Sequence, residues 1–146
     1  MSVREDQITA LGQARSKIAA VREERQARVE ECRRGIEAID LALQRLENRL
    51  RLLAIPRADL EKFAQSLSSA YLDSKMPDSI MAELVQKTNQ IGQYDAEMKE
   101  TSEAVSQLTK TRGDLDVNYR LAKDALAKIE AELAQVDRKI ADIRGF

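Results

Sequence analysis

Two apolar stripes with a seven-residue repeat restrict the possible folds of this chain more than any other feature of its sequence. In the first stripe the gaps alternate between three and four residues, through Val29, Cys32, Ile36, Ile39, Leu43, Leu46, Leu50 and Leu53. The second stripe runs from Ile91 to Ile143, and only Thr101 and Arg112 are polar among its roughly sixteen positions. Such spacing places each stripe on one face of a helix and is typical of a coiled coil.

Two prolines interrupt the sequence between the stripes. Pro56 is expected to break or kink the first helix at residues 55–57, and a short helix over 57–72 should follow it near the tip. The segment 73–77, Asp-Ser-Lys-Met-Pro, is the predicted turn. Pro77 can then open the second arm, because proline is well tolerated at the start of a helix. The sequence leaves open whether 57–72 continues the first arm or folds back as a third strand of a small bundle.

The two arms, 3–72 and 78–144, have nearly equal lengths and therefore predict an antiparallel hairpin. At 1.5 Å per residue each arm would extend for about 100 Å. Residue i would face roughly residue 150 minus i, so that Ile18 meets Leu133. We thus expect an all-α fold: residues 1–146 form one long antiparallel two-helix coiled-coil hairpin with a short kinked central helix near the tip.

The first stripe weakens towards the N-terminus. Three basic residues, Arg15, Arg22 and Arg25, stand where apolar side chains are expected. They could dock on an acidic partner protein. Alternatively, their aliphatic stems cover the seam while their charged groups pair with glutamates such as Glu23, Glu24 and Glu30. This end of the hairpin should pair loosely or meet another protein.

The residues needed for most enzyme chemistry are missing from the sequence. There is no histidine, the single Cys32 cannot build a zinc site, and the glycines are isolated. We therefore expect a protein that is not an enzyme and that needs no cofactor or metal. About a third of the residues are charged, but acids and bases alternate to a net charge of −1. The absence of a dense basic block argues against binding to nucleic acid.

Sequence features that would direct the chain to a membrane are also absent. The N-terminus is charged at once and has no apolar region of the kind found in signal peptides. No stretch approaches the 18 or so apolar residues of a membrane span. Cys32, as a small hydrophobe at an apolar helix position, fits a reducing compartment. We therefore expect a cytoplasmic monomer without direct membrane insertion.

A strip of side chains near the tip has two possible roles. Phe63, Leu67, Ala70 and Tyr71 lie on neighbouring faces of one helix. They supply more aromatic surface than a two-helix seam needs, which favours contact with a partner protein. The other interpretation is ordinary packing against the facing arm around Met81 and Leu84.

The segment from Ala58 to Ala70, ADLEKFAQSLSSA, resembles the middle of the central-stalk proteins of type III secretion systems, the FliJ/YscO family. The resemblance lies in Asp-Leu-Glu-Lys before an aromatic residue, and in the spacing of Phe63, Leu67 and Ala70. It implies that these three residues contact an export-gate membrane protein through its cytoplasmic domain. It also implies that the end bearing both termini, with Arg15, Arg22 and Arg25, sits in the pore of a hexameric export ATPase.

The resemblance therefore implies a stalk and adaptor at the base of a membrane secretion apparatus. The stalk would couple ATP turnover to gate opening and would also bind export chaperones. Two alternatives remain at this point. A prefoldin-like holdase would grip unfolded chains with its arm ends, although prefoldin subunits assemble through β-hairpins and the central segment lacks strand alternation. A coiled-coil scaffold would join two hairpins into a four-helix bundle.

Overall fold

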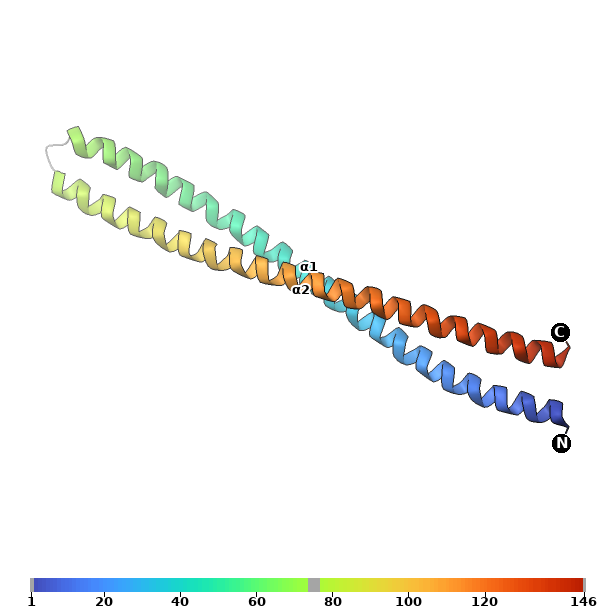
Figure 1. Ribbon diagram of the computed structural model, residues 1–146. Coiled ribbons are helices and arrows are strands. Elements are labelled where there is room, and N and C mark those ends of the chain that lie inside the picture. Colours follow the sequence, from blue (N-terminus) through green and yellow to red (C-terminus); the bar gives the residue numbers. More distant parts are fainter. Residues whose placement is uncertain (1, 74–76, 146) are drawn as a thin grey trace. The chain divides into compact units, whose positions relative to one another are not determined.

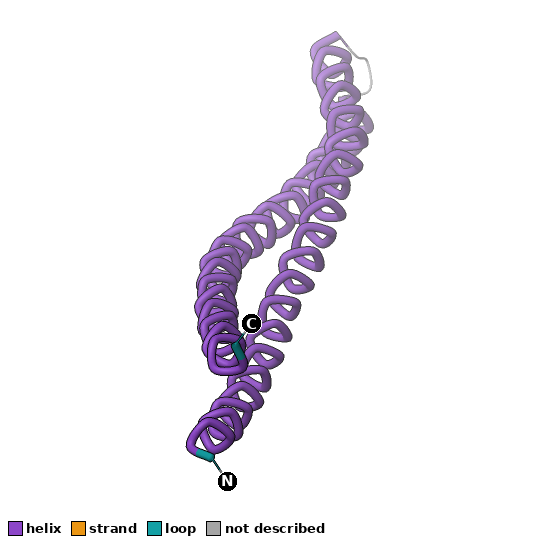
Figure 2. The backbone as a smooth tube through the Cα atoms, turned by 90° about the vertical axis from the view of Figure 1, so that its right-hand side faces the viewer, coloured by secondary structure: helices purple, strands orange, loops and turns teal. Residues whose placement is uncertain are grey.

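The computed structural model describes residues 2–73 and 77–145, and nearly all of them are helical. Helix α1 comprises Val3–Asp73 and helix α2 comprises Pro77–Arg144. Figure 2 shows helix along the described chain, which contains no strand. The predicted all-helical fold is therefore confirmed. The predicted turn, 73–77, falls largely on residues 74–76, which lie outside the described residues.

Local hydrogen bonds account for both outer ends of the helices. Ser2 caps α1, because its Oγ accepts a hydrogen bond from the Glu5 backbone N–H at 3.2 Å. A serine followed three residues later by a glutamate is the usual pattern of a capping box. At the other end, Gly145 has a positive φ of 84° and its N–H bonds to the Asp142 carbonyl at 3.2 Å. Glycine adopts this left-handed conformation without steric cost, so it ends α2 cleanly.

Helix α1 passes through Pro56 without ending there. Residues 57–73 belong to the same helix as residues 3–55, so the short central helix expected near the tip is a part of α1 and does not fold back as a separate helix. Proline removes one backbone hydrogen bond and crowds the preceding turn. A long helix with side-chain contacts before and after the proline can absorb that loss. A kink at residues 55–57 stays a prediction.

The chain divides into two compact units. Unit 1 contains Met1–Ala38 and Arg112–Phe146, and unit 2 contains Ile39–Thr111. Within each unit one segment of α1 and one segment of α2 run side by side in opposite directions (Figure 1). Each unit is therefore an antiparallel helix pair.

The register of unit 1 is given by contacts between its two helices. Arg15 meets Asp137, and seven residues later Arg22 meets Glu130. The nearest atom to a Cβ placed on Gly35 would be Leu115 Cδ1, at 3.4 Å. A step of one heptad forward on α1 thus corresponds to one heptad backward on α2. These pairs follow the predicted rule that residue i faces roughly residue 150 minus i.

Unit 2 follows the same register. Arg57 meets Asp95 at 2.6 Å, and Lys87 lies against Phe63. The side chains of the two apolar stripes are half-buried for the most part, since a single facing helix covers each of them from one side only.

Four stripe residues are the most buried: Cys32, Ala122 and Ile129 in unit 1, and Thr101 in unit 2. Their side chains are between 3% and 9% exposed. Thr101 is a polar member of the second stripe, but its Oγ1 donates to the Glu97 carbonyl at 2.8 Å, so its burial leaves no hydrogen-bonding group unpaired. The seam of each unit is therefore formed by the predicted stripe residues.

Neither α1 nor α2, as far as residues are described, has a stretch that is apolar enough to cross a membrane.

Candidate protein-binding site

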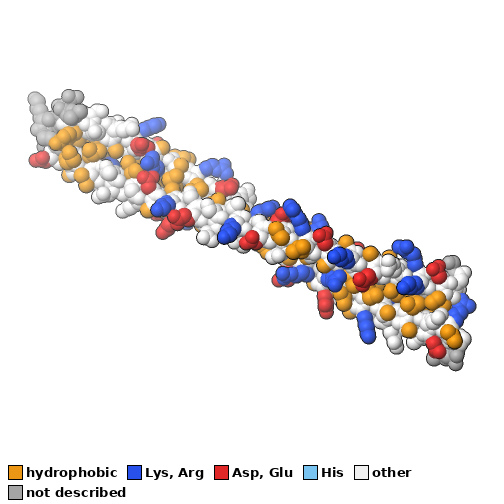
Figure 3. Space-filling model, in the orientation of Figure 1, with side chains coloured by type: hydrophobic (Ala, Val, Ile, Leu, Met, Phe, Trp, Pro, Cys, Tyr) orange, Lys and Arg blue, Asp and Glu red, His pale blue; other side chains and the backbone are white. Residues whose placement is uncertain are grey.

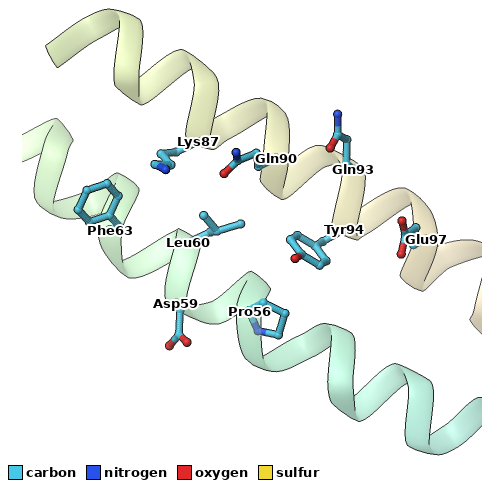
Figure 4. A pocket seen from close by; sticks show the side chains of 9 residues that line it. All are labelled: Pro56, Asp59, Leu60, Phe63, Lys87, Gln90, Gln93, Tyr94 and Glu97. Carbon is cyan, nitrogen blue, oxygen red and sulfur yellow. The ribbon is translucent and has the colours of Figure 1, made fainter. Parts of the chain in front are cut away.

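A groove of about 770 Å³ opens between α1 and α2 in unit 2. Its lining combines apolar, aromatic and polar side chains: Pro56, Asp59, Leu60, Phe63, Lys87, Gln90, Gln93, Tyr94 and Glu97. In Figure 4 the side chains of Leu60, Lys87 and Tyr94 reach into the space between the helices, while Asp59 and Gln93 point away from it. The groove thus has an apolar and aromatic floor with polar groups at its rim, a composition that suits a side chain of a partner protein.

The groove lies where the seam of unit 2 contains charged residues. The first stripe, continued past Leu53 in the same register, places Arg57 in the seam. The second stripe, continued upstream from Ile91, places Lys87 there. Neither side chain can fill a hole of the facing helix as an apolar knob would. The two helices therefore leave room between them at this level.

Arg57 is held away from the groove by acidic neighbours. Its Nε donates to Asp95 on α2 at 2.6 Å, and its Nη1 donates to Glu61 on α1 at 2.6 Å. The hydrogen bond with Asp95, followed by the charges of Asp95 and Glu61, raises the pKa of the Arg57 guanidinium. Arg57 thus stays charged and tied to both helices.

Phe63 is the exposed aromatic residue of the groove. Its side chain is 45% exposed, and the Lys87 ammonium lies 5.4 Å from the centre of its ring. A cation over an aromatic face at this distance is weakly attractive. Lys87, although it belongs to the seam, therefore covers Phe63 with a flexible chain rather than with packed apolar atoms. A partner could displace it at little cost.

The strip predicted near the tip divides into two parts. Leu67 and Tyr71 occupy seam positions of the continued first stripe and are half-buried, as packing against the facing helix requires. Phe63 and Ala70 lie beside the seam and are exposed. Of the four residues only Phe63 lines the groove. The structure thus separates an outward aromatic residue from seam residues that the sequence grouped with it.

Several lining residues were not predicted to bind a partner, among them Leu60, Lys87 and Tyr94. A signal for Lys87 was present, because the second stripe continues upstream of Ile91 with Leu84 in register. A lysine in an otherwise apolar seam marks a place where two helices cannot close fully.

The three arginines of unit 1 lie at its seam and bind the opposite helix. Arg15 is 2.6 Å from Asp137, Arg22 is 3.5 Å from Glu130, and Arg25 donates to the Ala125 carbonyl at 2.9 Å. The expectation that glutamates of their own helix pair with them was wrong in this respect. Glutamates close in sequence point around the outside of a helix, whereas side chains at the seam face the second helix.

Glu30, one of the glutamates expected to pair with them, is instead bound to Arg33, whose Nη2 lies 2.8 Å from it. The hydrogen bond and charge of Arg33 hold the pKa of Glu30 below its ordinary value of 4.5. Figure 3 shows the same mixture of charges over the visible face, with acidic and basic side chains close together and hydrophobic ones between them. No large surface of one sign appears on this face.

The described residues contain no group of three or more His, Cys, Asp or Glu side chains that could hold a metal ion. Comparison of the chain with protein-family models, with curated proteins and with solved structures gave no significant match.

Proposed function

We propose that this protein is an adaptor that binds other proteins, and that it is the central stalk of a type III secretion export apparatus. In this role it would couple a hexameric export ATPase to the export gate and could also bind export chaperones. The observation that supports the proposal is the position of Phe63. It is exposed beside an open groove, inside the segment 58–70 that resembles the FliJ/YscO family.

The groove would receive the gate protein. An apolar side chain of the cytoplasmic domain could displace Lys87 from Phe63 and rest on Leu60 and Tyr94. Aromatic residues in partly covered pockets dominate the energy of many protein interfaces. The polar residues at the rim would orient the partner while contributing little to the free energy of binding. Contact at this place leaves the seam residues Leu67 and Tyr71 to hold the helix pair together.

Unit 1 would receive the ATPase. Arg15 and Asp137 are each about half exposed, at 47% and 48%. Ion pairs with this exposure contribute at most about 1 kcal/mol to stability. A polar channel that offers acidic groups could therefore exchange partners with Arg15 and Arg22 without opening the helix pair.

Binding to the gate protein tests the first contact. Phe63→Ala should keep nearly all of its helicity and lose binding to the cytoplasmic domain of the cognate export-gate protein, because Phe63 is exposed and lines the groove. Val85→Ala is a matched control, because Val85 lies in the same unit and is 51% exposed but does not line the groove. Unchanged binding by Phe63→Ala would refute the assignment of the groove.

Stimulation of the ATPase tests the second contact. The intact chain should increase the turnover of the cognate export ATPase, and the triple variant Arg15→Gln, Arg22→Gln, Arg25→Gln should stimulate it less. Lys17→Gln serves as a control, since Lys17 is exposed on the same helix and lies outside the seam. If saturating protein leaves ATP turnover unchanged, the stalk proposal fails.

A scaffold function is the second candidate and is favoured by one observation. Val117 and Leu121 lie one turn apart on the outer side of α2, in unit 1, and are 54% and 60% exposed. Two copies could bury these side chains against each other and form a bundle. Sedimentation equilibrium separates the candidates: a stalk should have the mass of one chain, and a bundle at least twice that mass.

A further inference from the structure

Helix α1 has a further row of evenly spaced residues, the outer stripe, on the side that faces away from the seam of unit 2. Its members follow the same alternation of four and three residues: Leu41, Arg45, Asn48, Leu52, Ile55, Asp59 and Lys62. All seven are exposed. Side chains with this spacing stand in a row along one face of a helix. A second helix could therefore lie along this row as α2 lies along the seam.

The centre of this outer stripe is apolar. Leu52 and Ile55 are neighbouring side chains, one turn apart, and are 69% and 62% exposed. Leu41 continues the same face three turns upstream and is 49% exposed. Single exposed leucines are common on protein surfaces. Two large aliphatic side chains in contact range, both more exposed than half, form a small docking surface instead.

Pro56 adds a polar group to the same place. Proline has no backbone N–H, so it cannot donate the helical hydrogen bond to the carbonyl of Leu52, four residues earlier. The Leu52 carbonyl therefore lacks its usual donor four residues on, next to its own exposed side chain. A partner with a hydroxyl or amide donor among its apolar residues would satisfy it.

The charges around the apolar centre are mainly positive. Arg45 and Lys62 belong to the outer stripe, and Arg51 lies beside Leu52. Arg51 donates to the neutral Asn48 amide oxygen, and none of the three cations forms an ion pair with an acid in the described part of the chain. By contrast, Arg49 and Arg57, nearer the seam, pair with Glu97 and Asp95. Only Asp59 brings a negative charge to the outer stripe.

We propose that this outer stripe, centred on Leu52 and Ile55, binds an acidic amphipathic helix of another protein. The heptad spacing of the stripe favours a helical partner, because a helix can lie along it. The two aliphatic side chains favour a partner helix with an apolar face, and the three unpaired cations favour acidic residues on both sides of that face. The stripe is separate from the groove, of which it shares only Asp59 at the rim. A partner at the stripe and a partner at Phe63 are therefore two different contacts.

The test uses two labelled helical peptides of about three heptads, with leucine along one face. One peptide has glutamate on both sides of the leucines and the other has lysine in the same places. Fluorescence anisotropy with trace peptide and the full chain should show binding of the glutamate peptide at least tenfold tighter than that of the lysine peptide. The double variant Leu52→Ser, Ile55→Ser should bind the glutamate peptide at least tenfold more weakly than the parent chain does.

Matched variants separate the stripe from other surfaces. Val117→Ser with Leu121→Ser removes a similarly exposed apolar pair from unit 1 and should leave binding unchanged, as should Phe63→Ala. The triple variant Arg45→Gln, Arg51→Gln, Lys62→Gln should reduce the difference between the two peptides. Circular dichroism should show that all variants keep their helicity, since every substituted residue is exposed.

Two outcomes would overturn the proposal. If both peptides bind equally, or if Leu52→Ser with Ile55→Ser binds as the parent chain does, the stripe is not a site for an acidic helix. If the parent chain forms a dimer that the same double variant abolishes, a second copy occupies the stripe. Neither result depends on the groove at Phe63, so the stalk proposal stands or falls separately.

Discussion

The Arg15 guanidinium lies 2.6 Å from the Asp137 carboxylate, across the seam of unit 1. One heptad further along α1, Arg22 reaches Glu130, one heptad earlier on α2. The charged pairs therefore repeat in step with the apolar stripes and in opposite chain directions. Such pairs contribute little energy individually, but they disfavour a shift of one heptad, which would place Arg22 opposite Lys123 in one direction or Arg15 opposite Arg144 in the other.

Exchanging the charges of Arg15 and Asp137 should restore most of the stability that a change of Asp137 alone removes. Asp137→Arg places two positive charges together and should lower the free energy of unfolding by about 0.5–1 kcal/mol. Arg15→Glu in the same chain restores opposite charges and should recover most of the loss. Urea unfolding at low salt measures the free energy of unfolding of the parent chain, of Asp137→Arg and of the double variant. If the double variant is no more stable than Asp137→Arg, the two residues are not paired.

The buried stripe residues should dominate the stability of unit 1. Ile129 is 5% exposed, so Ile129→Ala should lower the free energy of unfolding by about 2–4 kcal/mol through lost packing. Leu121→Ala is the control, since Leu121 is 60% exposed on the same helix and should change stability by less than about 0.5 kcal/mol. Equal effects in urea unfolding would mean that the seam lies elsewhere.

Pro56 should weaken α1 locally without ending it. Pro56→Ala restores the N–H that can bond to the Leu52 carbonyl, and should stabilise this part of the helix by up to about 3 kcal/mol. Amide hydrogen exchange should show stronger protection over residues 50–60, and circular dichroism should change little because the helix is already continuous. A large gain in helicity would instead mean that Pro56 breaks α1 in solution.

Glu30 should make unfolding depend on pH. Its pKa in the folded chain is lowered, chiefly by the hydrogen bond from Arg33. The contribution of Glu30 is therefore fully present above its ordinary pKa of 4.5 and disappears as the pH falls through the lowered folded-state value. Glu30→Gln should be less stable than the parent chain at about pH 7 and equally stable at about pH 2. A difference that persists in acid would contradict the assigned ion pair.

The antiparallel pairing and its register could be predicted from the sequence because both depend on one repeating pattern. Arms of similar length, each with an apolar stripe, on either side of a proline-containing turn leave few other arrangements. Continuation of α1 through Pro56 could not be predicted, since local rules for proline disfavour it and only packing of the flanking turns decides the outcome. The register predicts partners for Arg15 and Arg22 on the opposite helix, whereas proximity in sequence alone favours glutamates of their own helix.

The groove was only half predictable. Phe63 stood out as an aromatic residue outside the needs of the seam. Lys87 did not stand out, because a lysine interrupts the apolar pattern of the second stripe in the heptad upstream of Ile91. The outer stripe at Leu52 and Ile55 was missed for a related reason. The outer stripe has the same three-and-four spacing as the seam, but three of its seven members are aliphatic and the others polar, so it does not stand out as an apolar repeat.

The distance between two spin labels in unit 1 tests whether α1 and α2 pair within one chain. Cysteines replace the exposed residues Lys17 and Ala134, with Cys32 changed to Ala, and the labelled protein is diluted with unlabelled chain. Paired helices have axes about 8–10 Å apart, so we expect one narrow distance distribution with a mean below about 30 Å at every dilution. A broad or much longer distribution, or a short distance that disappears on dilution, would contradict pairing within one chain.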